Sequence, residues 1–577
     1  MLFRQALSVV SLGSLALAVP YPSPDTIPAT LDLLSASLES VLNHLSAGNV
    51  SSLALVDAYL ARIEADNHKG LLLRAVIETA PPQTTGSVTG VRDLAKQYDE
   101  ERAAGTVRGR LHGVPMLVKD NCATDIELGM NTTAGSYALL GSSVPRDSHI
   151  VALLRQAGAI ILGKANLSEF ANYKGNIVSC SGRPRLNVQY ADLALRDRQT
   201  NGWSARGGQT QSAYVIGGFA AGGDPCGSSA GSGVGTSAGW AAAAIGTETD
   251  GSIICPSNRA ALYGIKPTVG LASRAGIVPI SSTQDTPGPM AKSAFDAALI
   301  LSVISGFDER DNATIPTQYR DFDYTTALVG KDGFKGLRLG VPRELFFNET
   351  LSGNSPEINI AVKYFFKFMF HGSISNHQLL TFSAAITKIA SLGATIQDPA
   401  NLPSSNDFLT SNNETFVLDT DFKVDLAAYL AALNGSTVLS LEDVINFNDA
   451  HADLEFPPGE CCQQTLMRAV QTTGKDTQAY ADARFADLDI GRTRGIDAVL
   501  KKYNLDALVL PSEGFATAPA AIAGYPIVTV PLGYLNATGQ PFGLAFIGTA
   551  YSERTLIQLM SAFEANFPPR RVPQQLK

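Results

Sequence analysis

The spacing of apolar residues predicts alternating helices and strands along most of the chain. Apolar positions recur at helical spacing over Leu53–Ala65 and Ile150–Ala157, and a further helix is expected from Ser168 onward. Short apolar runs predict buried strands at Leu111–Val118, Ala159–Leu162, Leu337–Val341 and Ala507–Leu510. This alternation predicts an α/β fold in which helices cover both faces of a sheet.

One stretch, Asp224–Pro267, follows neither period and is dense in Gly, Ala and Ser. It has too few charges for an ordinary surface and too little apolar volume for an ordinary core. We expect a Gly/Ser turn over Cys226–Gly235, a helical or buried segment over Ala238–Ile245, and a second turn over Gly246–Ser252. Two such turns across a packed element indicate a site, with a serine on each turn.

Length and charge narrow the class of protein. The chain has 577 residues without a linker-like stretch, so one large domain is expected. The net charge of −9 argues against a nucleic-acid surface. There is no CxxC pair, HExxH motif or EF-hand loop, so no metal is predicted.

Three ordered motifs carry a resemblance to a known family. The turn Gly227–Ser229, the segment Gly246–Ile253 and the segment Gly113–Asp120 resemble the motifs of the amidase signature family, and the tail Ser281–Ser293 fits as well. Members of this family are serine hydrolases with a Ser–Ser–Lys triad. The similarity runs from about Leu53 to Phe563. The residues of the motifs resemble the peptide-amidase-like branch most.

The resemblance implies a fold and a set of roles. The implied fold is an α/β/α sandwich around a large mixed sheet. Ser252 would be the nucleophile, Ser228 the proton relay on a cis peptide after Gly227, and Lys119 the base. The oxyanion hole would be formed by the backbone N–H groups of Thr249, Asp250, Gly251 and Ser252. The implied reaction cleaves a small-molecule or peptide amide to acid and ammonia or amine, with no cofactor and no partner subunit.

The residue types suit this chemistry. Amide hydrolysis needs a nucleophile, donors for the oxyanion and a proton for the leaving nitrogen. Gly251 permits a tight turn before Ser252. To accept a proton near neutral pH, the pKa of Lys119 must fall from ~10.4 to ~7–8. The apolar residues that precede Lys119 make a buried setting plausible.

Two other functions fit parts of the same stretch. The pattern G-x-S-x-G occurs around Ser229 and around Ser237, as in esterases and lipases of the α/β-hydrolase type. That mechanism needs a downstream histidine, and the candidates are His371, His377 and His451. A catalytically inactive secreted binding protein is the other alternative, although it would be expected to lack a member of the triad.

The N-terminus predicts secretion. Residues 1–18 resemble a signal peptide that ends in an A-x-A cleavage site, with an uncleaved membrane anchor as the alternative. Eight glycosylation sequons support a secreted glycoprotein, and those at Asn131 and Asn166 are expected to be too buried for modification. The pairing of the six cysteines cannot be deduced, and Cys226 and Cys255 are expected to be small buried thiols.

The remaining chain is organised around the motif region. A single domain over 19–577 is expected to have a signature core at about 111–293, a variable segment at about 310–500 and a return to the core at about 505–565. Tyr525–Ile547 predicts strand, turn and strand. Two segments, 175–200 and 366–384, interrupt the pattern. Each segment is either part of a lid over the substrate entrance or an intron translated by mistake. We favour introns, because the flanking residues restore a helix or a motif when each segment is deleted.

Overall fold

A computed structural model describes residues 27–175, 200–314, 322–347, 376–458, 460, 462–512 and 514–577. An 11-stranded mixed sheet runs through them in the order β1-β3-β2-β6-β8-β7-β12-β13-β11-β9-β10. Parallel pairs join β3, β2 and β6 near one end and β11, β9 and β10 at the other, while the strands between are antiparallel. The strands are β1 Val76–Thr79, β2 Pro115–Lys119, β3 Ile160–Ala165, β6 Ala244–Glu248, β7 Tyr263–Lys266, β8 Thr286–Ala291, β9 Arg338–Gly340, β10 Thr395–Gln397, β11 Ala507–Pro511, β12 Ile527–Tyr534 and β13 Pro541–Ile547; β4 Trp203–Ser204 and β5 Gly208–Gln209 form a separate ribbon.

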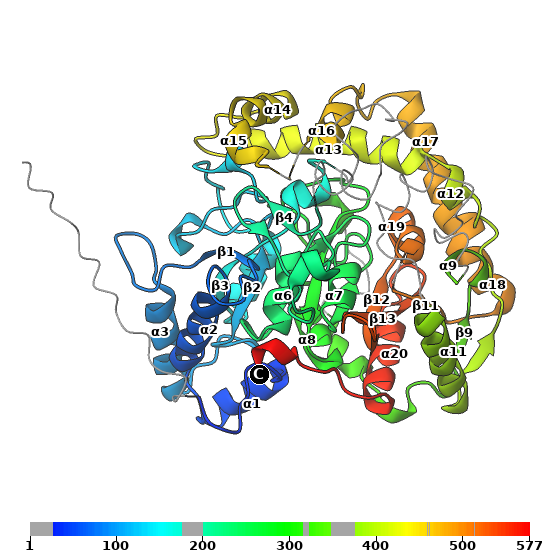
Figure 1. The fold of residues 1–577 in the computed structure, drawn as a ribbon, viewed down its shortest axis with the longest axis horizontal. Helices are drawn as coiled ribbons and strands as arrows, with labels where there is room; N and C mark the ends of the chain where they lie inside the picture. Colours follow the sequence, from blue (N-terminus) through cyan, green and yellow to red (C-terminus); the bar gives the residue numbers. More distant parts are fainter. Residues whose placement is uncertain are drawn as a thin grey trace, which may run out of the picture.

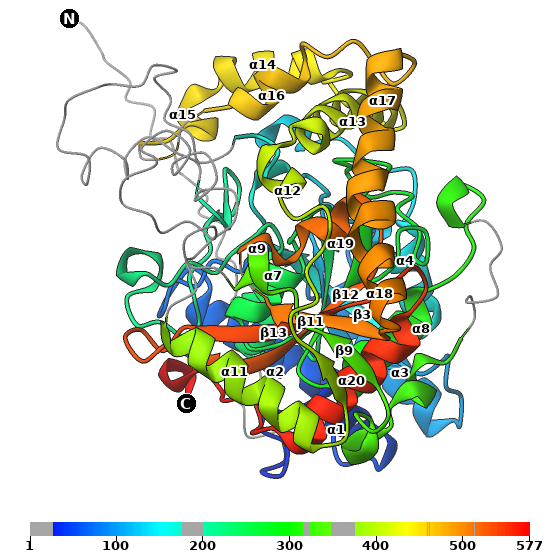
Figure 2. The same cartoon turned by 90° about the vertical axis from the view of Figure 1, so that its right-hand side faces the viewer.

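Helices cover both sides of this sheet, which confirms the predicted α/β class. Figure 2 shows α7 and α8 on opposite sides of the strands. The helices are α1 Leu38–Ser46, α2 Ser52–Asp66, α3 Val91–Ala103, α4 His149–Gln156, α6 Ala230–Ser237, α7 Ile254–Arg259, α8 Ala294–Ile304, α9 Arg343–Phe346, α11 Asn376–Ser391, α12 Asp407–Thr410, α13 Asn413–Ala431, α14 Leu441–Ala450, α15 Ala452–Glu455, α16 Gln464–Ala469, α17 Gln478–Leu488, α18 Asp497–Tyr503, α19 Ala518–Ala523 and α20 Glu553–Asn566.

The Gly/Ser-rich stretch folds differently from the prediction. Residues Ala230–Ser237 form α6, so the expected turn over Cys226–Gly235 is wrong beyond Ser229. Every residue of α6 is buried, so packing stabilises this helix against the low helix propensity of its glycines. A Cβ at Gly231 would meet the backbone of Asn166, which explains why a small residue is needed there. Ala238–Ile245 is buried, but it leads into β6 rather than forming a helix.

The helix expected from Ser168 onward is also wrong. The chain forms a single 3-10 turn over Glu169–Asn172, and Phe170 and Ala171 have left-handed φ values of 46° and 56°. The turn lets the Phe170 N–H donate to the Ala134 carbonyl at 2.9 Å, while the Ser168 N–H donates to the Ser228 carbonyl at 3.0 Å. Tertiary contacts with the site therefore replace the regular helix.

Helices α12–α17, residues 407–488, gather over one end of the molecule (Figure 1). We call this group the cover. It falls within the segment expected to be variable, and it contacts the motif tail, where Ser281 Oγ donates to Asp421 Oδ2 at 2.6 Å. Within the described residues, no helix combines the length and apolar character needed to cross a membrane.

Several sequence predictions concern residues outside the described part. The signal peptide, 1–18, and nearly all of the first interrupting segment lie there. Of the second, 366–384, residues from Asn376 onward form the first half of α11, which continues without a break through Ile386 to Ser391. The choice between lid and intron stays open, because the remainder of each segment is not described.

Candidate active site

Lys119 ends β2 and points into the centre of the motif region. Its side chain is fully buried, at 0% exposure. Its Nζ lies 2.8 Å from Ser228 Oγ, 2.9 Å from Thr247 Oγ1 and 3.1 Å from the Thr247 carbonyl oxygen. Because β2 and β6 are neighbours in the sheet, they bring Lys119 and Thr247 together. Two of the predicted catalytic residues, Lys119 and Ser228, are therefore in direct contact.

Burial lowers the pKa of Lys119 to about 7, and nearby groups, including the carboxylates of Asp285 and Glu248, raise it by less. A free amine in this range is half deprotonated at neutral pH, as a general base requires. The result agrees with the pKa expected from the apolar residues that precede Lys119.

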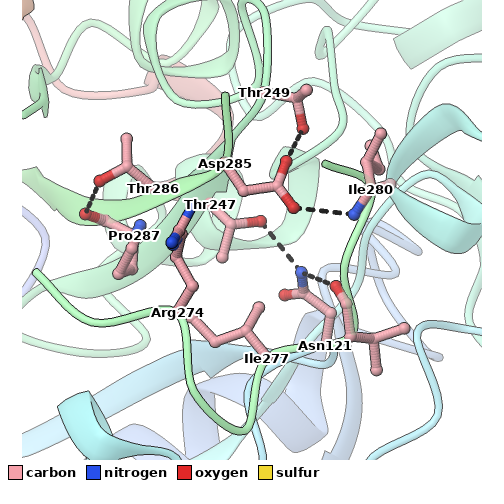
Figure 3. Close-up of a pocket in the computed structure, with 11 residues that line it drawn as sticks. Asn121, Thr247, Thr249, Arg274, Ile277, Ile280, Asp285, Thr286 and Pro287 are labelled. Atoms are coloured by element: carbon pink, nitrogen blue, oxygen red, sulfur yellow. Dashed lines mark hydrogen bonds between the residues drawn. The ribbon is translucent and has the colours of Figure 1, made fainter. Parts of the chain in front are cut away.

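Thr247 controls how the amine is oriented. A neutral lysine has two N–H donors and one lone pair. The carbonyl and hydroxyl oxygens of Thr247 can accept both donors, which leaves the lone pair directed at Ser228 Oγ. Asn121 fixes the threonine in turn, because its Nδ2 donates to Thr247 Oγ1 at 3.0 Å (Figure 3). The motif comparison did not identify Thr247 or Asn121 as site residues.

The other serines of the stretch are engaged elsewhere. Ser229 Oγ donates to the Thr247 carbonyl oxygen at 3.1 Å, and Ser237 Oγ donates to the Val234 carbonyl oxygen at 3.2 Å within α6. Both side chains are fully buried. His451 Nδ1 donates to the Phe447 carbonyl oxygen, 2.9 Å away on α14, rather than to either serine. His371 and the side chain of His377 lie outside the described part of the chain. An esterase arrangement around Ser229 or Ser237 is not assembled in the described residues.

Ser228 and Ser252 lie on turns that touch each other. The Ser229 N–H donates to the Ser252 carbonyl oxygen at 3.2 Å, and Ser252 is 5% exposed. The Gly227–Ser228 peptide bond is cis, as the family resemblance implied. The two serines of the implied triad are therefore held on adjacent pieces of backbone.

Glu248 shapes the nucleophile turn. Its carboxylate accepts the N–H of Gly251 at 3.0 Å, of Ile253 at 2.7 Å and of Ile254 at 2.9 Å. Gly251 has a φ of 86°, a left-handed value that favours glycine. Because Glu248 accepts the Gly251 N–H, three of the four predicted oxyanion-hole donors remain, the N–H groups of Thr249, Asp250 and Ser252. Sequence reasoning did not identify Glu248 in this role.

The tail of the motif region supports the same turn from another side. Thr249 Oγ1 donates to Asp285 Oδ1 at 2.5 Å, and Asp285 Oδ2 accepts the N–H groups of Ile280 and Ser281 at 2.8 and 2.9 Å (Figure 3). A small cavity of about 10 Å³ lies beside these residues and Thr247, enough for one water molecule. The resemblance of Ser281–Ser293 to the family tail thus corresponds to direct contacts with the site.

A disulfide joins the two turns and corrects the expectation of free thiols. Cys226 and Cys255 are bonded, with their Cα atoms 5.8 Å apart and a sequence separation of 29. Cys226 precedes the relay turn, and Cys255 lies in the first turn of α7, just after the nucleophile. Burial alone favoured a thiol at these positions, whereas the folded backbone brings the two close enough to bond. Cys122 is a buried free cysteine.

The described residues contain no group of three or more His, Cys, Asp or Glu side chains that could hold a metal ion.

Comparison with known proteins gives the assignment of the family. The profile of the amidase family matches residues 54–190 and 208–515. The chain belongs to the amidase family. A protein of Arthroderma benhamiae named as an amidase is 35% identical to this chain, over 90% of this chain and 79% of its own length. These matches place the chain among enzymes that hydrolyse amide C–N bonds.

Solved structures within the family agree. The peptide amidase of Stenotrophomonas maltophilia is similar with a TM-score of 0.77 and 36% identity, covering 93% of this chain and 98% of that one. An amidase family protein of Bacillus anthracis gives a TM-score of 0.76 and 28% identity, covering 94% and 93%. The predicted fold and the likeness to the peptide-amidase branch are confirmed.

Proposed function

We propose that this amidase is a serine amidohydrolase that forms an acyl-enzyme on Ser252, with Ser228 as proton relay and Lys119 as base. The observation that carries the proposal is the contact between the buried Lys119 amine and Ser228 Oγ, with both remaining Nζ contacts made to Thr247. A solvated lysine at the end of a strand would need neither burial nor three acceptors. The proposed substrate is a small-molecule or peptide amide.

The proposed proton path extends the contact between Lys119 and Ser228 to Ser252, which lies on the adjacent turn. Ser252 Oγ attacks the carbonyl carbon, Ser228 Oγ takes the proton of Ser252, and Lys119 Nζ takes the proton of Ser228. The N–H groups of the nucleophile turn stabilise the oxyanion. When the C–N bond breaks, the proton returns through Ser228 to the leaving nitrogen, and ammonia or an amine departs. Water then attacks the ester, with its proton passing along the same relay, and releases the acid and Ser252.

An activity panel tests this function. Purified mature protein would be assayed on primary amides, including C-terminally amidated peptides, and on the matching simple esters. We expect ammonia release from amides by the protein alone, without added cofactor or partner subunit. Turnover of esters with no turnover of any amide would contradict the proposal and would favour the esterase alternative.

We also propose that the protein is secreted and glycosylated. The predicted signal peptide supports secretion, and the Cys226–Cys255 disulfide fits an oxidising compartment. The sequon residues Asn49, Asn312, Asn434 and Asn536 are exposed. Asn166 is fully buried, and its Nδ2 donates to the Arg74 and Gly208 carbonyl oxygens, so that sequon is not expected to be modified. N-terminal sequencing of protein from the culture medium and a mobility shift after endoglycosidase treatment would test both features.

A further inference from the structure

Four polar side chains meet beside the nucleophile turn, where the cover approaches the core. They are Asp250 on that turn, Gln284 on the motif tail, Glu414 in the first turn of α13 and Asp487 near the end of α17. Gln284 Nε2 donates to Glu414 Oε1 at 2.9 Å, which links tail and cover. Helices α13 and α17 pack together, and this brings Asp487 to the group. We call these four residues the acceptor recess.

The recess contains buried acceptors without a donor. Asp250 Oδ1, Gln284 Oε1 and Asp487 Oδ2 are buried oxygens that accept no hydrogen bond from the described residues. Gln284 is 0% exposed and Asp487 is 1% exposed, whereas Asp250 and Glu414 are only partly buried. Gln284 and Asp487 are therefore more deeply buried than Asp250 and Glu414. Unsatisfied buried acceptors are costly, so each calls for a donor.

The charges of the recess point the same way. Three carboxyl groups have two cations nearby: Arg484, whose Nη1 donates to the Ile522 carbonyl oxygen at 3.3 Å, and Lys266, whose charge acts on Asp250. Burial raises the pKa of Glu414 to about 7 and that of Asp487 to about 7. Burial, followed by the charge of Glu414, also holds the pKa of Asp250 well above its usual range. Acidic groups therefore outnumber basic ones around the recess, and a cation that can also donate hydrogen bonds would stabilise it.

A primary ammonium group has the required chemistry, with one positive charge, three donors and no acceptor. Asp250 is two residues before Ser252 on the same turn. One substrate molecule can therefore place its ammonium group in the recess and its amide carbonyl at Ser252. We infer that the acceptor recess binds an ammonium group on the acyl part of the amide substrate. This inference rests on the proposed function and names the substrate class that the site prefers.

Pairs of substrates that match in size test the inference. N-acetyl-lysinamide would be compared with N-acetyl-norleucinamide, and N-acetyl-ornithinamide with N-acetyl-norvalinamide, using kcat/KM at neutral pH. We expect the cationic member of at least one pair to be preferred tenfold or more. Equal kcat/KM values within both pairs would overturn the inference and leave amide hydrolysis intact. Failure to cleave any amide would instead overturn the proposed function, and the inference with it.

Substitutions separate the recess from the overall negative charge. In Glu414→Gln and Asp487→Asn, the ratio of cationic to neutral kcat/KM should fall to near one. Asp425→Asn is the matched control, because Asp425 also lies on α13 but pairs with Lys475 at 2.7 Å outside the recess; it should keep the wild-type ratio. If the preference survives in both recess variants, or falls equally in the control, the recess is not its source. Even if a recess variant does not fold, the ratio of cationic to neutral kcat/KM in the wild-type protein still tests whether an ammonium group is preferred.

Discussion

The motif core and the cover are held together by different kinds of contact. Around Lys119, Ser228 and Thr247, the contacts are hydrogen bonds between buried backbone, hydroxyl and amine groups. The cover packs on the core through a buried apolar cluster, in which Phe422 of α13 contacts Phe170 and Tyr173, and charged groups add to this contact. Lys174 Nζ pairs with Glu169 at 2.7 Å and also with Glu455 of α15. The proposed proton path therefore lies in a hydrogen-bonded network, whereas the cover is held on the core by apolar packing together with buried ion pairs.

The difference suggests a division of labour. None of the hydrogen bonds of the Lys119 amine goes to a described residue of the cover, and Glu414 of the cover lies beside Asp250 of the nucleophile turn. We expect changes in the core to act on the rate of bond cleavage, whereas changes in the cover act on substrate choice and stability. The five predictions below test this separation.

The largest effect is expected at the triad. Ser252→Ala should remove covalent labelling by a fluorophosphonate and reduce amide turnover by about 10⁴-fold or more, and Lys119→Ala should be nearly as damaging because the members act as a unit. Ser229→Ala is the matched control: it removes a hydrogen bond but no proton-transfer group. Loss of labelling in Ser229→Ala with retention in Ser252→Ala would contradict the assignment.

Acid should inactivate the wild-type enzyme. Lys119 must be neutral to accept a proton, and its pKa is lowered to about 7. The protonated fraction therefore rises as pH falls, and kcat/KM for an uncharged amide should decrease about tenfold per pH unit below this value and level off above it. A profile that stays flat between pH 5 and pH 8 would show that Lys119 is not the titrating base.

Removal of the Thr247 hydroxyl should weaken the orientation of the base. Thr247→Val keeps the shape but removes one acceptor of Lys119 and the acceptor of Asn121. We expect kcat for amides to fall about 10–100-fold with little change in KM, because only the proton-transfer step is affected. Thr247→Ser keeps the hydroxyl and should recover most of the activity. A loss confined to KM would contradict an orienting role.

The disulfide should matter to the site as well as to stability. In the double variant Cys226→Ser/Cys255→Ser, the relay and nucleophile turns lose their covalent link. We expect a several-fold slower rate of fluorophosphonate labelling at temperatures well below the melting transition. Thermal unfolding measured in parallel distinguishes a local effect from global unfolding. An unchanged labelling rate together with a lower Tm would limit the bond to a stabilising role.

The smallest effect on activity is expected in the cover. Glu455→Gln leaves Lys174 with one carboxylate instead of two in a buried site, which should cost about 3 kcal/mol of unfolding free energy. Turnover of small amides should change less than threefold. Asp407→Asn, which breaks a partly exposed pair with Arg494, should cost about 0.5 kcal/mol at most. A large loss of amide turnover in Glu455→Gln would disprove the separation of core and cover.

Sequence patterns predicted the parts of this fold that depend on local spacing. The helix at Leu53–Ala65 appears as α2, the runs at Leu111–Val118 and Ala507–Leu510 overlap β2 and β11, and Tyr525–Ile547 forms β12 and β13. Each has its own apolar period, which needs no knowledge of distant residues. The triad residues could be named because three motifs occur in order.

Features that depend on distant contacts could not be predicted in this way. α6 forms in a Gly/Ser run because β-strands pack around it, and the left-handed turn at Phe170 is fixed by Ala134. The acceptor recess combines residues from the nucleophile turn and two helices of the cover, more than 150 residues away. Glu248 was visible in the quoted motif, and its position at the end of a strand before a glycine turn was the signal for its role.

The loop that Cys226 and Cys255 close also bears on how the protein can be made. It encloses both serines of the triad within 29 residues of chain, and a loop of this size is expected to restrict the unfolded chain by about 3–4 kcal/mol. A host whose cytoplasm keeps thiols reduced would deliver the chain without this link. The specific activity of protein from such a host can be compared with that of protein made through an oxidising secretory route. The difference would show how much activity is lost when the disulfide does not form.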